Sequence, residues 1–166
     1  MWELLNSIEH SGFPTWVRES PSVFAFPTVL LLHTIGMGIV VGIVGGIDLR
    51  ILGLAPALPL APMERYFPVA WAGFWVNAVT GTILVMQDAT TVMSNPDFYV
   101  KMTFIALALT NVVVLRKRVF RDPLIDKMPQ STNSKILAVT SILFWLGAIT
   151  AGRLMAYVGP VSGLSK

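Results

Sequence analysis

The stretch LLLHTIGMGIVVGIVGGIDLR, from Leu30 to Arg50, decides the fold of this chain. It is apolar on both sides of a single histidine, His33, and it ends at Asp48 and Arg50. A helix needs about 20 apolar residues to cross a hydrocarbon core that is about 30 Å thick. We therefore expect this stretch to form a membrane-spanning helix with one ionisable ring inside it.

The composition extends this expectation to the whole chain. Of its 166 residues, 54% are hydrophobic and 13% are charged, and the mean hydropathy is +0.69. Soluble domains carry about 25% charged residues. The charges are also clustered, which leaves charge-free windows at residues 20–47, 66–87, 102–115 and 136–152. The third window is short, but it is long enough for a span if the Lys101 side chain reaches the headgroups.

The windows predict an all-α fold, a four-helix transmembrane bundle that forms a single domain over residues 1–166. The long helices are expected at about residues 22–48, 68–88, 96–118 and 133–158. The third of them opens on Asn95-Pro96, which is typical of an N-cap followed by proline at the first helical position.

A short interfacial helix is expected over residues 1–12, lying flat on the membrane surface. Its apolar residues gather toward one face when the segment is helical: Trp2, Leu4, Leu5 and Ile8. The segment has no early basic residue and carries Glu3 and Glu9, so we do not expect it to be a cleavable signal peptide.

Positive charge falls mostly in one expected loop. The net charge is +3 and the pI is near 9.5, and six of the 12 basic residues lie between the third and fourth helices: Arg116, Lys117, Arg118, Arg121, Lys127 and Lys135. Loops rich in Lys and Arg remain in the cytoplasm. The first loop adds Arg50 and Arg65 to that side, whereas the opposite side holds Arg18, Lys101 and Lys166.

This count of eight against three leaves out Arg153, which lies inside the fourth span. It predicts a multi-pass protein of a bacterial inner membrane with both termini outside, in the periplasm. The clustering of basic residues in one loop is typical of membrane topology and argues against a nucleic-acid partner. The chain has no cysteine, which excludes disulfides and thiolate chemistry.

The glycines of the first span predict a structural contact. Gly38, Gly42 and Gly46 are four residues apart and lie on the side of the helix opposite His33. Small residues with this spacing let a second helix backbone approach closely. We expect the stripe to hold the helix inside the bundle or in a dimer, and we assign structural roles to Asp48 and Arg50 at the end of the span.

His33 is the centre of the expected functional site. Ionisable groups within a span mark functional sites. Lys101, Arg153 and Tyr157 are expected in one layer above it, together with Asp88, which would pair with Arg153. This arrangement suits a b-type haem, because the His33 imidazole would be an axial ligand of the iron and the cations above it would bind the haem propionates. The second ligand would come from Met37, Met86 or Met102, or from His33 of a second copy.

Two other interpretations of His33 use the same atoms. His33 with Met37 one turn away, and further methionines, would suit Cu(I). A neutral histidine bonded to a threonine, to Asn77 or to Asn111 on a neighbouring helix would have only a structural role. No catalytic constellation is recognisable: there is no Ser–His–Asp arrangement, no carboxylate pair within the spans, no phosphate loop and no HExxH.

Four pieces of the chain carry a resemblance: LLHTIGMGIVVGIVGGIDLRILG, AGFWVNAVTGTILVMQD, NPDFYVKM and AGRLMAY. In this order, from Phe26 to Tyr157, they resemble an uncharacterised family of small four-helix bacterial integral membrane proteins. The family's pattern, HxxG, DLRxLG, TG and GRxxAY, carries over to His33, Asp48, Leu49, Arg50, Leu52, Gly53, Thr80, Gly81, Lys101, Gly152, Arg153, Ala156 and Tyr157.

The resemblance implies a four-helix fold, and the family is distantly similar to copper-resistance membrane proteins and to b-type cytochrome membrane subunits. Some members carry a histidine late in the third helix, where this chain reads NVVVLRKRVF. That difference counts against a pair of histidine ligands within one chain.

The sequence therefore predicts a small integral membrane subunit, redox-type or accessory, that binds haem b near His33. A copper-handling membrane protein and a structural subunit without a cofactor are the alternatives. The expected partners are the lipid bilayer and either further copies of the chain or the other subunits of a larger membrane complex.

Overall fold

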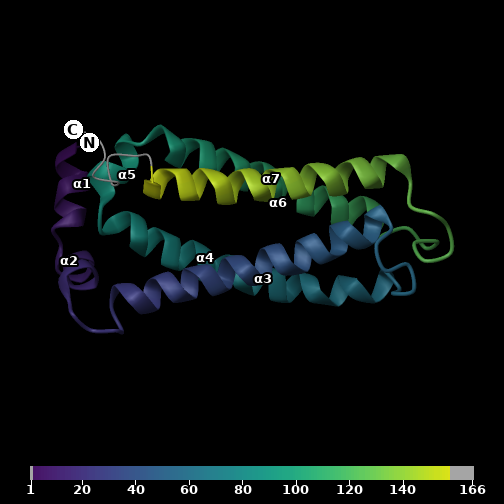
Figure 1. The fold of residues 1–166 in the computed structure, drawn as a ribbon, viewed down its shortest axis with the longest axis horizontal. Helices are drawn as coiled ribbons and strands as arrows, with labels where there is room; N and C mark the ends of the chain where they lie inside the picture. The colour runs from purple at the N-terminus through teal and green to yellow at the C-terminus, as the bar shows by residue number, and fades with distance from the viewer. Residues whose placement is uncertain (1, 158–166) are drawn as a thin grey trace.

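Four long helices dominate the computed structural model, which describes residues 2–157, with the side chains of residues 156 and 157 left out. They are α3 (Phe26–Leu52), α4 (Phe67–Met86), α6 (Pro96–Val119) and α7 (Thr132–Tyr157), and they run alongside one another (Figure 1). All four are long and apolar enough to cross a membrane. The predicted all-α fold is confirmed, and the chain is a multi-pass membrane protein with four candidate spans.

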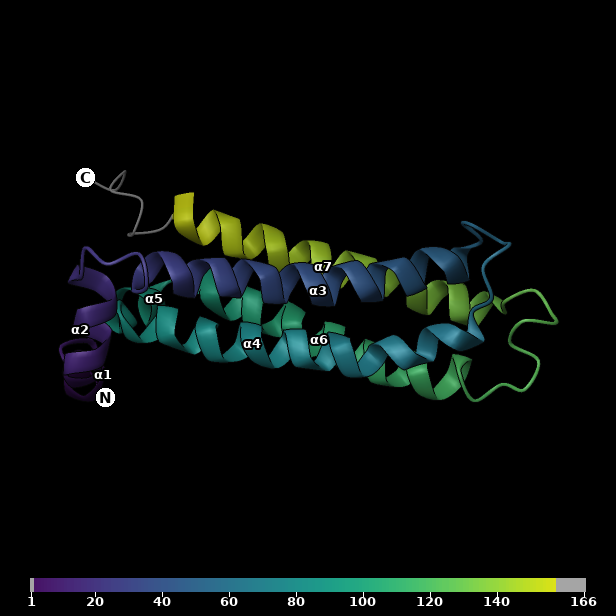
Figure 2. The ribbon, with the colours of Figure 1, turned by 90° about the horizontal axis from the view of Figure 1, so that it is seen from below.

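Short helices cover one end of the long ones. They are α1 (Trp2–Glu9), α2 (Gly12–Glu19) and α5 (Ala89–Ser94). Both ribbon views place α1 and α2 across the ends of the long helices (Figures 1 and 2), and we call this the capped end. At the opposite end, the loop end, residues 53–66 and 120–131 connect the spans, the first of these through the 3-10 helix η1 (Ala61–Tyr66).

The N-terminal segment differs from the single helix expected over residues 1–12. The first helix ends at Glu9, and a second helix begins at Gly12. Between them, the Ser11 hydroxyl donates to the Ile8 carbonyl at 2.7 Å, a local side-chain bond that competes with continuation of the helix. Pro14 in the first turn of α2 suits a helix start.

The ends of α3 also differ from the expected residues 22–48. Pro27 lies in its first turn, which fits a helix start. The helix passes Asp48 and stops at Leu52, because Gly53 adopts a left-handed conformation with φ 106° and closes the helix as a C-cap. Asp48 is therefore inside the last turns of the span and not at its end.

The start of α6 confirms the expected cap. The Asn95 side-chain oxygen accepts a hydrogen bond from the Asp97 backbone N–H at 2.9 Å, and Pro96 follows it as the first helical residue. Asn95 is 1% exposed, so this cap is buried at the junction between α5 and α6.

The long helices form two hairpins. α3 packs on α4, α6 packs on α7, and the two pairs meet mainly through α3 and α7. In Figure 1, α3 crosses α4 and diverges from α7 toward the capped end. The tightest apolar core accordingly lies toward the loop end, where it includes Val44, Ile47, Ile51, Phe67, Leu115 and Val119.

The crossing of α3 and α4 is made by a pair of glycines that differs from the predicted stripe. A Cβ added to Gly36 would lie 2.8 Å from the Gly73 carbonyl oxygen, and one added to Gly73 would lie 3.1 Å from the Gly36 carbonyl oxygen. The two backbones therefore touch at this point, which only glycine permits.

The predicted stripe faces outward. A Cβ added to Gly38, Gly42 or Gly46 would meet nothing within 4 Å among the described residues, and all three are exposed. Its expected place inside the bundle is wrong, because the neighbour α4 approaches from the side of Gly36. Its role in a dimer stays a prediction, which the size of the protein in mild detergent would test.

The loop end is held by side-chain contacts to the connectors. The Asp126 carboxylate accepts hydrogen bonds from the backbone N–H groups of Leu60 and Ala61, at 2.5 and 3.0 Å, and so joins the two connecting segments. Arg50 donates to the carbonyls of Pro56 and Leu58 in the first connector. These bonds tie the first connector to the end of α3.

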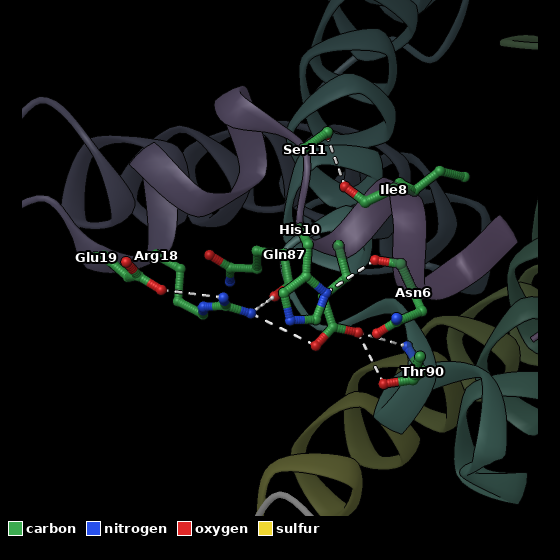
Figure 3. A network of polar contacts seen from close by, with 9 residues as sticks. Asn6, Ile8, His10, Ser11, Arg18, Glu19, Gln87 and Thr90 are labelled. Atoms are coloured by element: carbon green, nitrogen blue, oxygen red, sulfur yellow. Dashed lines mark hydrogen bonds and ion pairs between the residues drawn. The ribbon is translucent and has the colours of Figure 1, made fainter. Parts of the chain in front are cut away.

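A polar network fastens the N-terminal helices to the bundle (Figure 3). The buried Glu9 carboxylate accepts hydrogen bonds from the Thr90 backbone N–H at 3.1 Å and from the Thr90 hydroxyl at 2.7 Å. Arg18 donates to the Gln87 carbonyl at 3.0 Å and forms an ion pair with Glu9 at 3.5 Å. The Thr90 N–H lowers the pKa of the Glu9 carboxyl below its ordinary value of 4.5.

Gly36→Ala should lower the thermal stability of the protein in detergent. Its methyl group would overlap the Gly73 carbonyl, and overpacking of this kind typically costs about 1–3 kcal/mol. Gly38→Ala is the matched control, because it adds the same methyl group to the same helix where nothing lies within 4 Å among the described residues. Equal melting temperatures for the two variants would contradict the close crossing.

Acid should detach α1 from α5. A carboxylate whose pKa is lowered by folding stabilises the folded state fully above its ordinary value, here 4.5, and this contribution is lost as the pH falls through the folded value. Protease cleavage within residues 1–20 should therefore accelerate below about pH 4.5. Glu9→Gln should abolish that pH dependence and the exposed Glu3→Gln should retain it, so identical profiles for both variants would argue against this role of Glu9.

Candidate functional site

A cavity of about 340 Å³ lies between the two hairpins in the half of the bundle nearer the capped end. Every long helix contributes to its wall, and α5 contributes one residue. Its lining is predominantly apolar and comprises His33, Met37, Val40, Phe74, Asn77, Ala78, Gly81, Thr82, Val85, Met93, Phe98, Lys101, Met102, Ile105 and Trp145. Ligand sites in proteins are typically clefts of roughly 300–1,000 Å³ with few polar groups, and this cavity has that character.

His33 is held in one orientation by α4. Its Nδ1 lies 3.0 Å from the Asn77 backbone carbonyl oxygen and 3.2 Å from the Thr80 hydroxyl, and that hydroxyl donates to the Val76 carbonyl at 2.6 Å. A carbonyl can only accept, so Nδ1 carries the hydrogen. In the neutral ring, Nε2 is then an unprotonated acceptor, and among the described residues it has no hydrogen-bond partner.

Asn77 returns the contact, because its side-chain amide donates to the His33 backbone carbonyl at 2.7 Å. A Cβ added to Gly81 would lie 2.9 Å from His33 Cε1, so the ring fits against α4 only because Gly81 has no side chain. The expected bonding of His33 to a threonine or to Asn77 is confirmed. Asn111 was also expected as a possible partner, but it donates to the Thr140 hydroxyl at 2.8 Å.

Lys101 brings a cation to the cavity from the second hairpin. Its aliphatic stem packs against α7, since a Cβ added to Gly152 would lie 3.5 Å from Lys101 Cδ and Cε and 3.6 Å from Nζ. Within the described part of the chain, Lys101 has no ion-pair partner. A charged amine on an apolar wall without a counter-ion favours an anionic group in the cavity.

Three thioethers also line the cavity. Met37 lies one turn beyond His33 on α3, Met93 belongs to α5, and Met102 comes from α6. Met86, which was expected as a possible ligand, is not part of the lining. The residues that the structure describes contain no group of three or more His, Asp or Glu that could hold a metal ion.

Arg153 is not brought into the cavity. It is exposed and is absent from the cavity wall. The expected pair between Asp88 and Arg153 is wrong: among the residues with described side chains, neither belongs to an ion pair. Asp88 instead takes the N-cap position of α5. The Tyr157 side chain lies outside the described residues, so of the expected cationic layer only Lys101 is found at the cavity.

The sequence analysis did not identify two large aromatic side chains that line the cavity, Phe74 on α4 and Trp145 on α7. Trp145 is 8% exposed and belongs both to the cavity wall and to the apolar core. Tryptophan in membrane proteins is enriched at the two interfaces, whereas Trp145 lies near the middle of α7. That mid-span position is the signal in the sequence that points to the interior of the bundle.

Searches of protein-family models, curated proteins and solved structures found no match to this chain. Of the resemblance drawn from the sequence, the part that stands is the four-helix membrane fold, which the four long apolar helices support. Any role for the cavity therefore has to be argued from its own chemistry.

Proposed function

We propose that the chain is a redox-type or accessory membrane subunit whose cavity binds a b-type haem through His33. The observation that carries this proposal is His33 Nε2, which has no hydrogen-bond partner among the described residues and lies at the wall of an apolar cavity, with Nδ1–H fixed on the Asn77 carbonyl. Metal-ligating histidines usually donate their second ring nitrogen to a carbonyl or carboxylate in this way, which fixes the tautomer and orients the ring.

The other groups at the cavity fit the same ligand. Lys101 supplies a cation from α6 that would pair with a propionate. Met102 also comes from α6, whereas His33 comes from α3, so the two hairpins offer an imidazole and a thioether to a group between them. His and Met together are a known axial pair for haem iron. When bound, haem would supply one-electron transfer, and the protein would orient it and exclude water.

Copper is the second candidate because three methionines line the cavity beside His33. Thioether and imidazole ligands are soft and select Cu(I) over harder ions. The structural alternative assigns the polar contacts of His33 and Asn77 only to the packing of α3 on α4. The three alternatives differ in cofactor content and can be separated on the purified protein.

The orientation in the membrane is part of the proposal. The loop end carries the basic cluster from Arg116 to Lys135, together with Arg50 and Arg65. The positive-inside rule places this end in the cytoplasm of a bacterium, and the capped end with the cavity on the periplasmic side. The exposed glycines of α3 leave a face on which a second copy or another subunit could pack.

Cysteine labelling should confirm this orientation. The chain has no cysteine, so single replacements report without background. In intact cells, a membrane-impermeant maleimide should label Ser7→Cys at the capped end but should reach Lys127→Cys at the loop end only after lysis. Both positions are exposed. The reverse pattern would overturn the assignment.

Spectra and metal content of the purified protein test the cofactor. A haem Soret band that His33→Ala removes, while the protein remains folded, is expected. Lys101→Gln should weaken haem retention by roughly 5- to 30-fold, the equivalent of losing a contact of about 1–2 kcal/mol. Arg153→Gln, the matched control outside the cavity, should bind as the parent does. Copper without a Soret band would favour the second candidate. If the protein contains neither haem nor copper, the structural alternative is supported.

A further inference from the structure

A second ionisable group of α3 is buried in the bundle and does not line the cavity. Asp48 is 0% exposed, and among the described residues neither of its carboxylate oxygens has a hydrogen-bond partner. The Ser141 side chain of α7 lies beside the carboxyl group. Its hydroxyl is also 0% exposed and makes no hydrogen bond of ordinary geometry with the described residues.

The position of Asp48 follows from the packing of α3 on α7. The residue lies about one turn from the loop end of α3, where the two helices approach in Figure 1. Its neighbours along the helix face, Val44, Ile47 and Ile51, belong to the apolar core. Asp48 is therefore buried beside the apolar core, and it is not among the residues that line the cavity.

The charged groups of the surrounding elements are turned to other partners. On α3, Arg50 donates to the Pro56 and Leu58 carbonyls. Before α4, Arg65 donates to the Tyr66 hydroxyl. On α6, Arg116 forms an ion pair with Glu64 at 3.1 Å. Lys135 of α7 is exposed, and none of the ion pairs in the described part of the chain includes Asp48.

These surroundings suit a carboxylic acid and not a carboxylate. An ionised carboxylate without a cation or hydrogen-bond donors is among the costliest groups to bury, and such a group neutralises by taking up a proton. The neutral acid has one hydrogen to donate, and the Ser141 oxygen beside it has acceptor capacity for that hydrogen. One serine hydroxyl can accept the hydrogen of a neutral carboxylic acid, but it cannot by itself stabilise a buried negative charge.

We propose that Asp48 is a proton-binding site of this membrane protein, which takes up one hydrogen ion per chain at the loop end and holds it against Ser141. The uptake converts COO⁻ and H⁺ to COOH and needs no other reactant. The site lies 15 residues along α3 from His33, or about 22 Å at about 1.5 Å per residue. Asp48 does not line the cavity, so the proposal does not rest on the proposed cofactor.

Infrared spectroscopy of the full-length protein in detergent tests this site. A protonated carboxylic acid has a carbonyl stretching band separate from those of amides and carboxylates, and its frequency depends on hydrogen bonding. At neutral pH the parent should show one such band, and Asp48→Asn, which has the shape of the neutral acid, should lose it. His33→Ala is the control and should keep the band at the same frequency, whether or not the cavity holds a cofactor.

Absence of the band from the parent at neutral pH, or its persistence in Asp48→Asn, would overturn the proposal. If Asp48→Asn does not fold, Ser141→Ala takes its place, because removing the acceptor should shift the frequency of the Asp48 band. An unchanged band in Ser141→Ala would equally count against the site.

Discussion

The contact on which the rest of this structure depends is the close crossing of α3 and α4. In a hydrocarbon core, helices are not driven together by the hydrophobic effect, so they pair through close van der Waals packing and hydrogen bonds. Gly36 and Gly73 bring the two backbones together, and His33 and Asn77 exchange hydrogen bonds beside them. The glycines provide the proximity, and the polar pair fixes the rotation of each helix.

This crossing also explains the cavity. Because α3 and α4 cross, they cannot both follow the second hairpin along their whole length. In Figure 1, α3 lies near α7 toward the loop end, where the apolar core is, and diverges from α7 toward the capped end. The space is bounded by α5 and by side chains of all four long helices. The N-terminal helices complete that end through Glu9, Arg18 and their contacts to residues 87–90 (Figure 3). The crossing of α3 and α4 thus accounts both for the apolar core toward the loop end and for the cavity toward the capped end.

Two ionisable groups on α3 meet the cost of burial in different ways. One ring nitrogen of His33 is hydrogen-bonded to α4, and the other has no partner in the described part of the chain and lies at the cavity, as in histidines that bind metals. Asp48 has an apolar environment with one serine beside it, which favours the neutral acid. About four turns of helix separate the two groups, so they do not contact each other.

The sequence by itself determined the number of spans, their approximate limits and the Asn95 cap, and it indicated that His33 needs a polar partner, with a threonine, Asn77 and Asn111 as the candidates. These follow from local features: the length of an apolar run, a capping residue, and the need of a buried polar group for a neighbour of matching chemistry. The tertiary structure alone decided which glycines meet and that Arg153 stays outside the cavity. The physical reason is that helices hydrophobic all round carry no sequence signal for the face they turn inward, so their rotation is set only when neighbouring helices pack.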